Sequence, residues 1–368
     1  MCAEFASIHS AIQDLKAGKM VIVVDRDDRE NEGDLVCLAE AASPENINFM
    51  TKYGKGLVCV PMAEELLNRL QIPLMVKENE DKYRTAFTVS VDHIQTGTGI
   101  SAQDRALTIQ ELLNLNSKPE DFRKPGHVFP LQARQNGVLE RDGHTEAAVD
   151  LARLAHATPA AVICEVMNDD GTMARLPELQ VMARHHQLKI ISIQDLIAYR
   201  KRKEKLVERK SVHKLTVENK KLSIYMYNNY LTNSEHILVL NDNDTAERII
   251  DIYVETAANK LLQSIGWSHK DDLKERMKKL EQEEPRGVFC IRKEQKKEDM
   301  FTNMYSKKNL NQTCQDAELL HDDYVVMAKI LKDLGINKIR LSQSVPEVEE
   351  ILLTFEIIIM SKEPKQVL

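Results

Sequence analysis

The sequence predicts a layered α/β (α+β) fold in residues 1–200 and a second, smaller α/β domain in residues 201–368. In the first part, short apolar runs alternate with segments of helical periodicity, which is typical of α/β layers. That part carries 21 Lys+Arg and 29 Asp+Glu, a balance of −8, whereas the second carries 29 and 28, a balance of +1. Ten of the 13 glycines lie in the first part, so glycine-dependent loops are expected there.

The strands expected in the first part are apolar runs, and the expected helices begin at capping residues. Ser43, followed by proline and an acid, favours a helix start, and Gly54 suits the end of that helix. Apolar and polar side chains alternate over residues 86–92, which predicts a half-buried strand. The predicted elements are strands 20–25 and 35–39, helix 43–54, strand 56–61, helix 63–70, strand 86–92, helix 102–114, strand 128–133, helix 145–155, strand 161–166, helix 177–187, strand 189–193 and helix 195–200.

The second part is expected to be helical and lysine-rich, and to follow a charged linker at 201–205. It contains only three glycines, so it offers few tight polar loops. The predicted elements are strand 237–240, helices 245–262 and 270–284, strand 287–292, a mobile loop at 294–313, helix 324–334, strand 338–341 and helix 345–354.

Composition argues against several classes of protein. The sequence has no run of 18 or more apolar residues that would indicate a membrane span. A net charge of −7 gives no reason to expect nucleic-acid binding. The N-terminus lacks the pattern of a secretion signal, and the six scattered cysteines suit a reducing compartment. We therefore expect a cytoplasmic protein that binds neither membranes nor nucleic acid.

The most informative segment is the acidic stretch 27–34, which lies between two predicted strands. It holds five carboxylates and one arginine, and these carboxylates repel one another unless a cation lies among them. Carboxylate oxygens and water are the ligands that Mg²⁺ prefers. The stretch is therefore a candidate cation site, and a solvated acidic turn is the alternative interpretation.

A second polar segment, 141–146, stands where the helix 145–155 is expected to begin. A helix N-terminus suits a phosphate, and Arg141 and Thr145 add a charged donor and a hydroxyl. His144 can bind a metal through a neutral ring nitrogen. The alternative interpretation makes Thr145 an ordinary N-cap and His144 a surface histidine.

His127 and Glu165 are candidates for proton transfer. His127 lies between two prolines just before a strand, where a fixed imidazole can exchange protons near neutral pH. Glu165 lies within the apolar strand 161–166, where a carboxylate is costly unless it is paired, liganded or protonated. The alternative is that Glu165 points to water from an edge strand.

Four segments, in order and at fitting separations, resemble the signatures of the 3,4-dihydroxy-2-butanone 4-phosphate synthase family: 28–34 (DRENEGD), 123–131 (RKPGHVFPL), 143–146 (GHTE) and 168–175 (NDDGTMAR). The resemblance implies a homodimeric enzyme of riboflavin biosynthesis. Such an enzyme converts a sugar phosphate, D-ribulose 5-phosphate, to L-3,4-dihydroxy-2-butanone 4-phosphate and formate with Mg²⁺ or Mn²⁺. It implies metal ligands Glu30 and His144 and proton-transfer residues His127 and Glu165. The implied substrate contacts are Arg29, Glu30, Asp34, Arg141, Thr145 and Glu165.

Residues 201–368 resemble GTP cyclohydrolase II in two segments, 285–290 and 328–341. That family holds zinc with three closely spaced cysteines ahead of the first segment, but this chain has no cysteine between Cys164 and Cys290. Because a tetrahedral site of this kind needs those thiolates, we expect a degenerate domain without zinc and without cyclohydrolase activity. The alternatives are a bifunctional enzyme, or a noncatalytic binding or scaffold protein of the same fold.

Overall fold

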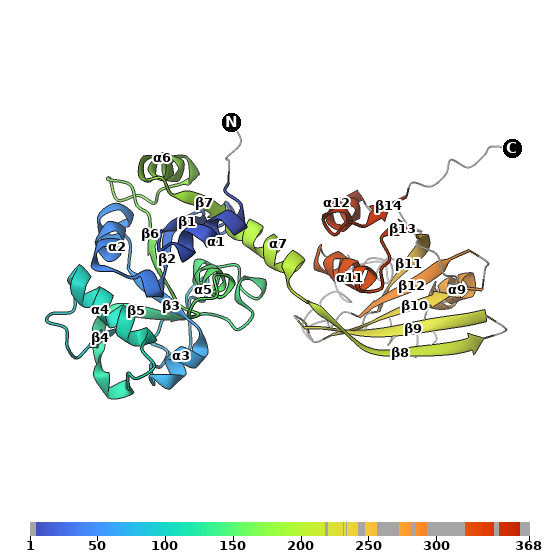
Figure 1. The fold of residues 1–368 in the computed structure, drawn as a ribbon, viewed down its shortest axis with the longest axis horizontal. Helices are drawn as coiled ribbons and strands as arrows, with labels where there is room; N and C mark the ends of the chain where they lie inside the picture. Colours follow the sequence, from blue (N-terminus) through green and yellow to red (C-terminus); the bar gives the residue numbers. More distant parts are fainter. Residues whose placement is uncertain are drawn as a thin grey trace, which may run out of the picture. The chain divides into compact units, whose positions relative to one another are not determined.

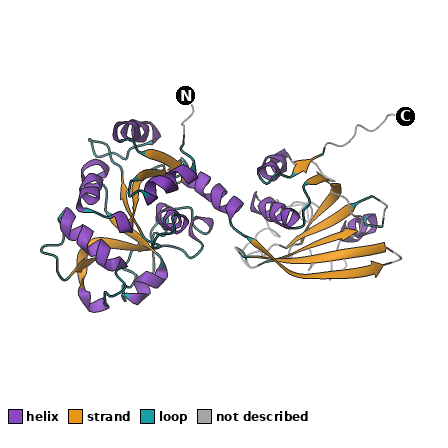
Figure 2. Ribbon diagram, viewed as in Figure 1, coloured by secondary structure: helices purple, strands orange, loops and turns teal. Residues whose placement is uncertain are grey.

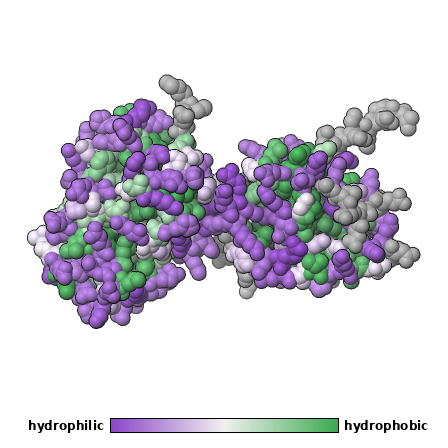
Figure 3. All heavy atoms as spheres, in the orientation of Figure 1, coloured by the Kyte–Doolittle hydropathy of each residue, from purple (hydrophilic) through white to green (hydrophobic). Residues whose placement is uncertain are grey.

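The computed structural model describes residues 5–217, 220–230, 232, 234–241, 247–255, 272–281, 284–292, 321–341 and 346–360. The chain forms two compact units, Met1–Arg200 and Lys201–Leu368 (Figure 1). On the face drawn in Figure 3, most of the coloured surface of each unit is hydrophilic. Within the described ranges, no helix has the length and apolar content needed to cross a membrane.

The first unit is built on one seven-stranded sheet in the order β4-β5-β3-β6-β2-β1-β7. Its strands are β1 (Val21–Val24), β2 (Gly33–Leu38), β3 (Cys59–Met62), β4 (Val91–His93), β5 (Phe122–Gln132), β6 (Ala161–Glu165) and β7 (Lys189–Ser192). Its helices are α1 (Ile8–Lys16), η1 (Ala39–Ala41), α2 (Pro44–Phe49), η2 (Met50–Gly54), α3 (Glu64–Arg69), α4 (Ala102–Leu113), η3 (Pro119–Asp121), η4 (Gly137–Leu139), α5 (His144–Leu154), α6 (Leu176–His186) and α7 (Ile193–Lys203).

Helices cover both faces of this sheet, so the first unit has three layers. Successive strand residues point to opposite faces. Ile22 and Val24 of β1 pack in the core beneath α2, α3, α4 and α6. Val21 and Val23 pack in a separate core with α1, α5 and α7. Each such fully buried side chain stabilises the unit by about 1.5–3 kcal/mol, and double burial explains why the strands read as unbroken apolar runs.

The second unit is also built on a seven-stranded sheet, in the order β14-β13-β11-β12-β10-β9-β8. Leu222, Val239 and Val288 from three of its strands pack against Leu280, which directly follows α9. Its strands are β8 (Val207–Val217), β9 (Lys220–Asn229), β10 (Glu235–Asn241), β11 (Glu247–Glu255), β12 (Arg286–Arg292), β13 (Lys338–Leu341) and β14 (Ile358–Ile359). Its described helices are α9 (Asp272–Lys279), α11 (His321–Asp333) and α12 (Pro346–Thr354).

The predicted α/β class is confirmed for both sheets, but the second unit differs from its prediction in detail. The described part of that unit is mainly strand (Figure 2). The helix predicted at 245–262 is wrong over Glu247–Glu255, which is strand β11 between β12 and β13. The predicted linker at 201–205 begins within α7, which continues to Lys203. The predicted loop at 294–313 lies outside the described residues.

Smaller differences occur in the first unit. The predicted strand 86–92 overlaps β4 (Val91–His93) only at Val91 and Asp92, and Phe87 and Thr88 form isolated bridges. Helix α1 and the hairpin of β8 and β9 were not predicted. Helix α5 begins at His144 with Gly143 as its N-cap, so Thr145 is not the cap.

Candidate active site

The acidic stretch is a loop folded around one carboxylate, Asp25, which directly follows β1. Asp25 Oδ2 accepts hydrogen bonds from Arg29 Nη1 and from the backbone N–H of Glu30, both at 2.9 Å. Asp25 Oδ1 accepts the backbone N–H of Glu32 at 2.8 Å. Asn31 has φ +55°, the left-handed conformation in which asparagine is one of the better tolerated residues. The loop is therefore hydrogen bonded internally and is not a simple solvated turn.

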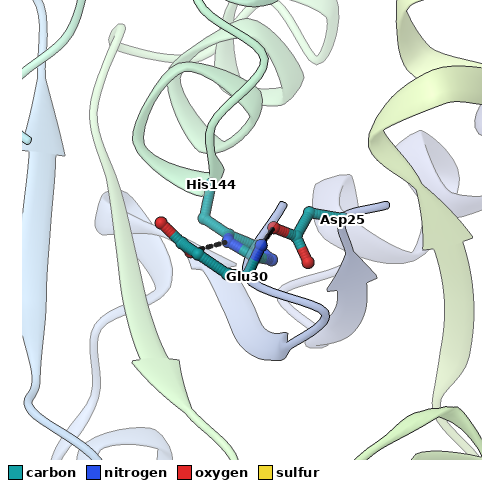
Figure 4. Close-up of side chains that lie close together, drawn as sticks. All are labelled: Asp25, Glu30 and His144. Atoms are coloured by element: carbon teal, nitrogen blue, oxygen red, sulfur yellow. Dashed lines mark hydrogen bonds and ion pairs between the residues drawn. The ribbon is translucent and has the colours of Figure 1, made fainter. Parts of the chain in front are cut away.

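Glu30 and His144 face each other across this loop (Figure 4). Glu30 Oε2 lies 3.5 Å from His144 Nδ1. The other ring nitrogen, Nε2, lies 3.1 Å from the carbonyl oxygen of Val23, which can only accept. Nε2 therefore carries a proton, and Nδ1 points toward the carboxylate. Asp25, Glu30 and His144 have ligand atoms within 4.8 Å of one another.

The charges of this group alter its proton affinities. Burial alone would raise the pKa of Glu30, but the hydrogen bond to His144 and the charge of Arg29 outweigh it and lower this pKa. Burial would lower the pKa of His144, but Asp34, Glu30 and Asp25 raise it to about 9. With no cation present, an imidazolium thus balances the surrounding carboxylates.

Asp34 and Glu165 stand side by side on neighbouring strands. They are register partners between β2 and β6, so their side chains share one face of the sheet. Asp34 is 3% exposed, and its Oδ1 has no hydrogen-bond partner within the described structure. Burial, with the charges of Glu165 and Glu30, raises the pKa of Asp34 to about 7 despite the opposing charge of His144. Two carboxylates are thus held close together beside His144.

Gly56, shortly before β3, leaves the space that the Glu165 side chain occupies. Glu165 Oε2 accepts the backbone N–H of Leu57 at 2.8 Å. A Cβ on Gly56 would lie 2.4 Å from that oxygen and 2.7 Å from the backbone oxygen of Glu165. Because β6 is bordered by β3 and β2, Glu165 is not on an edge strand.

Arg141 and Thr145 lie at the start of α5. Arg141 donates from Nη1 to Glu146, from Nε to the carbonyl of Tyr83 at 2.9 Å and from Nη2 to Thr85 Oγ1 at 2.9 Å. Thr145 is 3% exposed. Tyr83 donates its hydroxyl to the carbonyl of Arg29 at 2.7 Å. The loop containing Tyr83 therefore joins the start of α5 to the acidic loop.

His127, on β5, makes its contacts with Asp92. Nδ1 of His127 lies 2.7 Å from Asp92 Oδ2, and the backbone N–H of His127 donates to Asp92 Oδ1 at 2.8 Å. Since the carboxylate accepts, the proton sits on Nδ1 and Nε2 is left as the free acceptor. The His127 side chain is 45% exposed, so it is accessible.

Comparison with known proteins identifies the first unit. Residues 9–199, just over half of the chain, match the family model described as 3,4-dihydroxy-2-butanone 4-phosphate synthase. The chain belongs to this family. Residues 208–364 match the model described as GTP cyclohydrolase II. The chain is therefore a 3,4-dihydroxy-2-butanone 4-phosphate synthase with a second, GTP cyclohydrolase II-like domain.

Curated relatives match nearly the whole chain. "Riboflavin biosynthesis protein RibBA" of Bacillus cereus is 43% identical over 375 residues, which cover 98% of this chain and 94% of the relative. The protein of that name from Bacillus mycoides is 42% identical over 372 residues, with the same two coverages.

The chain is also similar to solved structures, including one of two domains and one with bound magnesium. RibBX of A. baumannii, described as a two-domain 3,4-dihydroxy-2-butanone 4-phosphate synthase, has a TM-score of 0.68 and 35% identity and covers 92% of this chain and 94% of its own. A synthase in complex with two magnesium ions has a TM-score of 0.52 and 42% identity and covers 54% of this chain and 98% of its own.

The residues of the synthase domain fit a divalent cation. Glu30 Oε2 and the unprotonated Nδ1 of a neutral His144 both offer an electron pair to a cation, and the two atoms lie 3.5 Å apart. The bond from Nε2 to Val23 fixes the tautomer that leaves Nδ1 available, as is usual for metal-bound histidine. Asp25 completes the group, although both of its oxygens already accept hydrogen bonds.

The structure brings five predicted site residues of the synthase domain together at one end of β2 and β6: Arg29, Glu30, Asp34, His144 and Glu165. His144 is 6% exposed, so it is not a surface histidine. Three supporting residues had no predicted role. Asp25 and Arg175 bind the backbone of the acidic loop, and Asp92 orients His127. A signal existed for Arg175, which ends the family segment 168–175, and for Asp25, which stands at a strand end.

Proposed function

We propose that the synthase domain converts D-ribulose 5-phosphate to L-3,4-dihydroxy-2-butanone 4-phosphate and formate, with Mg²⁺ or Mn²⁺ held by Glu30 and His144. The observation that carries the proposal is the facing pair of ligand atoms, Glu30 Oε2 and His144 Nδ1, beside the carboxylates of Asp34 and Glu165. The relative solved with two magnesium ions supports the choice of cation.

When bound, the divalent cation supplies Lewis-acid stabilisation of negative charge on the oxygens of the ketose. Arg29 and Asp34 lie beside the ligands and contact the sugar. Arg141 uses three N–H groups within the protein and has two left for an anionic substrate. With Thr145 and the backbone N–H groups at the start of α5, these donors suit the phosphate.

Two groups of the chain carry the proton transfers in this proposal. His127 acts as general base through Nε2, because Asp92 holds the Nδ1 proton and the ring orientation. Glu165 accepts and returns a proton while the N–H of Leu57 fixes one of its oxygens. Enolisation, loss of water and release of one carbon as formate each move protons, which is why two such groups are needed.

Chelation tests the proposal directly. EDTA is expected to abolish formate release from ribulose 5-phosphate, and added Mg²⁺ is expected to restore it. Glu30→Gln keeps the shape of the side chain and removes an anionic ligand, so it is expected to weaken Mn²⁺ binding by about 10-fold or more, measured by titration calorimetry. Formate release that is indifferent to EDTA would remove the cation from the proposal.

We propose further that the second domain has no GTP cyclohydrolase activity and serves as a structural or regulatory module. No cysteine lies between Cys164 and Cys290, where the resemblance implies three zinc ligands. RibBX supports this interpretation, because it is described as a synthase of two domains. The competing proposal is a bifunctional enzyme, since residues 208–364 match the GTP cyclohydrolase II model.

Assay with GTP and Zn²⁺ separates these two proposals. Purified full-length protein is expected to release neither formate nor pyrophosphate from GTP, and metal analysis is expected to find no stoichiometric zinc. Activity of the same preparation on ribulose 5-phosphate is the control for native protein. Turnover of GTP would establish the bifunctional enzyme instead.

A further inference from the structure

Arg175 directly precedes α6 and contacts the backbone of the acidic loop, 145 residues earlier in the chain. Its Nη1 donates to the carbonyl oxygen of Glu30 at 2.9 Å and also to the carbonyl oxygen of Asn31. One guanidinium nitrogen therefore binds two successive carbonyls, which lie on either side of the Asn31 Cα.

The base of Arg175 is fixed by helix α6. The backbone N–H of Arg175, the N-cap residue of the helix, donates to Glu178 Oε2 at 3.0 Å. One turn later, Leu179 packs on the backbone of the loop's end, where a Cβ on Gly33 would lie 2.4 Å from Leu179 Cδ1. Two independent contacts, from Arg175 and from Leu179, thus hold helix α6 against the acidic loop.

These contacts fix the backbone of Glu30 on both sides. Its N–H donates to Asp25 Oδ2 at 2.9 Å, and its carbonyl accepts from Arg175. The next residue, Asn31, has the left-handed φ of +55°, so the chain turns sharply directly after Glu30. Because Arg175 fixes the two carbonyls, it also fixes this turn. The turn directs the Glu30 side chain toward His144.

We propose that Arg175 is a positioning residue for Glu30: it clamps the two carbonyls of the acidic loop so that the Glu30 carboxylate is preorganised as a ligand of the divalent cation. The proposal rests on the assignment of Glu30 and His144 as cation ligands. Residues that orient metal ligands typically change metal affinity by 10- to 100-fold when they are replaced.

Mn²⁺ binding to the full chain tests the clamp without measuring turnover. Arg175→Gln is expected to raise the Kd for Mn²⁺ by about 10-fold or more, measured by calorimetry or by electron paramagnetic resonance of free Mn²⁺. The matched control is Arg184→Gln, which removes the same charge from an exposed position on the same helix and is expected to leave the Kd unchanged. Millimolar guanidinium is expected to restore part of the affinity in Arg175→Ala, which loss of fold would not allow.

The outcomes distinguish this inference from the proposal beneath it. If Glu30→Gln binds Mn²⁺ as tightly as the natural protein, the cation site itself is wrong. If Glu30→Gln weakens binding and Arg175→Gln does not, the clamp is overturned and the cation site stands. Should Arg175→Gln fail to fold, Arg175→Lys is compared with Arg184→Lys, because a lysine keeps the charge but not the planar fork. Equal Kd values for those two variants would also overturn the clamp.

Discussion

Glu165→Gln is expected to lower kcat for formate release from ribulose 5-phosphate by about 10²- to 10⁴-fold, the range that a general acid–base group contributes. Glutamine keeps the size of the side chain, and its oxygen can still accept the N–H of Leu57. It cannot exchange a proton at neutral pH.

His127→Ala is expected to lower kcat within the same range, since it removes the imidazole that Asp92 orients. Steady-state assays with saturating Mg²⁺ measure both effects.

Stability measurements keep these losses distinct from unfolding. His127 is 45% exposed, and the glutamine keeps the shape of Glu165, so neither change opens a large cavity and the melting temperature is expected to stay close to that of the natural protein. The matched control is Glu65→Gln, an equal change at an exposed position of α3. Normal formate release by Glu165→Gln or by His127→Ala would exclude that residue from the mechanism.

The proximity of Glu30 and His144 was predictable because their residue types carry their chemistry in the sequence. A dense acidic loop and a histidine at a helix start each indicate a cation or anion site, and the family resemblance joined them across more than a hundred positions. The contacts that support them were not predictable. Asp92 lies 35 residues before His127, and no local pattern indicates that β4 and β5 bring the two together. Arg175 resembles any arginine before a helix until its partners are known.

The fold was predictable where burial alone determines structure. Strands β1 and β2 are buried on both faces, so their apolar runs indicated them directly. The error at β11 has a clear cause, because charged residues at Arg248 and Asp251 interrupt an apolar run at a spacing that also suits a helix. Parallel pairing with β12 and β13 decides the outcome there, and such long-range pairing leaves no local signal.

The second domain is expected to lose stability in mild acid because of one histidine. His236, on β10, is 2% exposed. Its Nδ1 accepts the backbone N–H of Arg292 at 3.4 Å, and its Nε2 lies 3.2 Å from Ser234 Oγ. Burial, with the charge of Arg292, lowers its pKa to about 4 against the opposing charge of Asp323. The folded domain therefore holds the His236 ring in its neutral form.

The sign of the effect follows from the two pKa values. An unfolded chain takes up the proton near pH 6.5, whereas the folded domain takes it up only near pH 4, so the unfolded state binds more protons between them. The stabilisation is complete above pH 6.5 and is lost as the pH falls toward 4. The loss amounts to about 3 kcal/mol of the free energy of unfolding. Amide hydrogen exchange in β10 and β12 at pH 7 and near pH 4.5 measures it within the full chain.

A variant isolates this histidine from other groups that titrate over the same range. His236→Asn can still accept the N–H of Arg292 but cannot be protonated, so its free energy of opening is expected to fall by about 2 kcal/mol less than that of the natural protein between pH 7 and pH 4.5. His213→Asn, at an exposed position of β8, is the control and should follow the natural protein. If the free energy of opening depends on pH equally in His236→Asn and in the natural protein, the folded domain takes up the His236 proton as readily as the unfolded chain. That result would contradict the prediction.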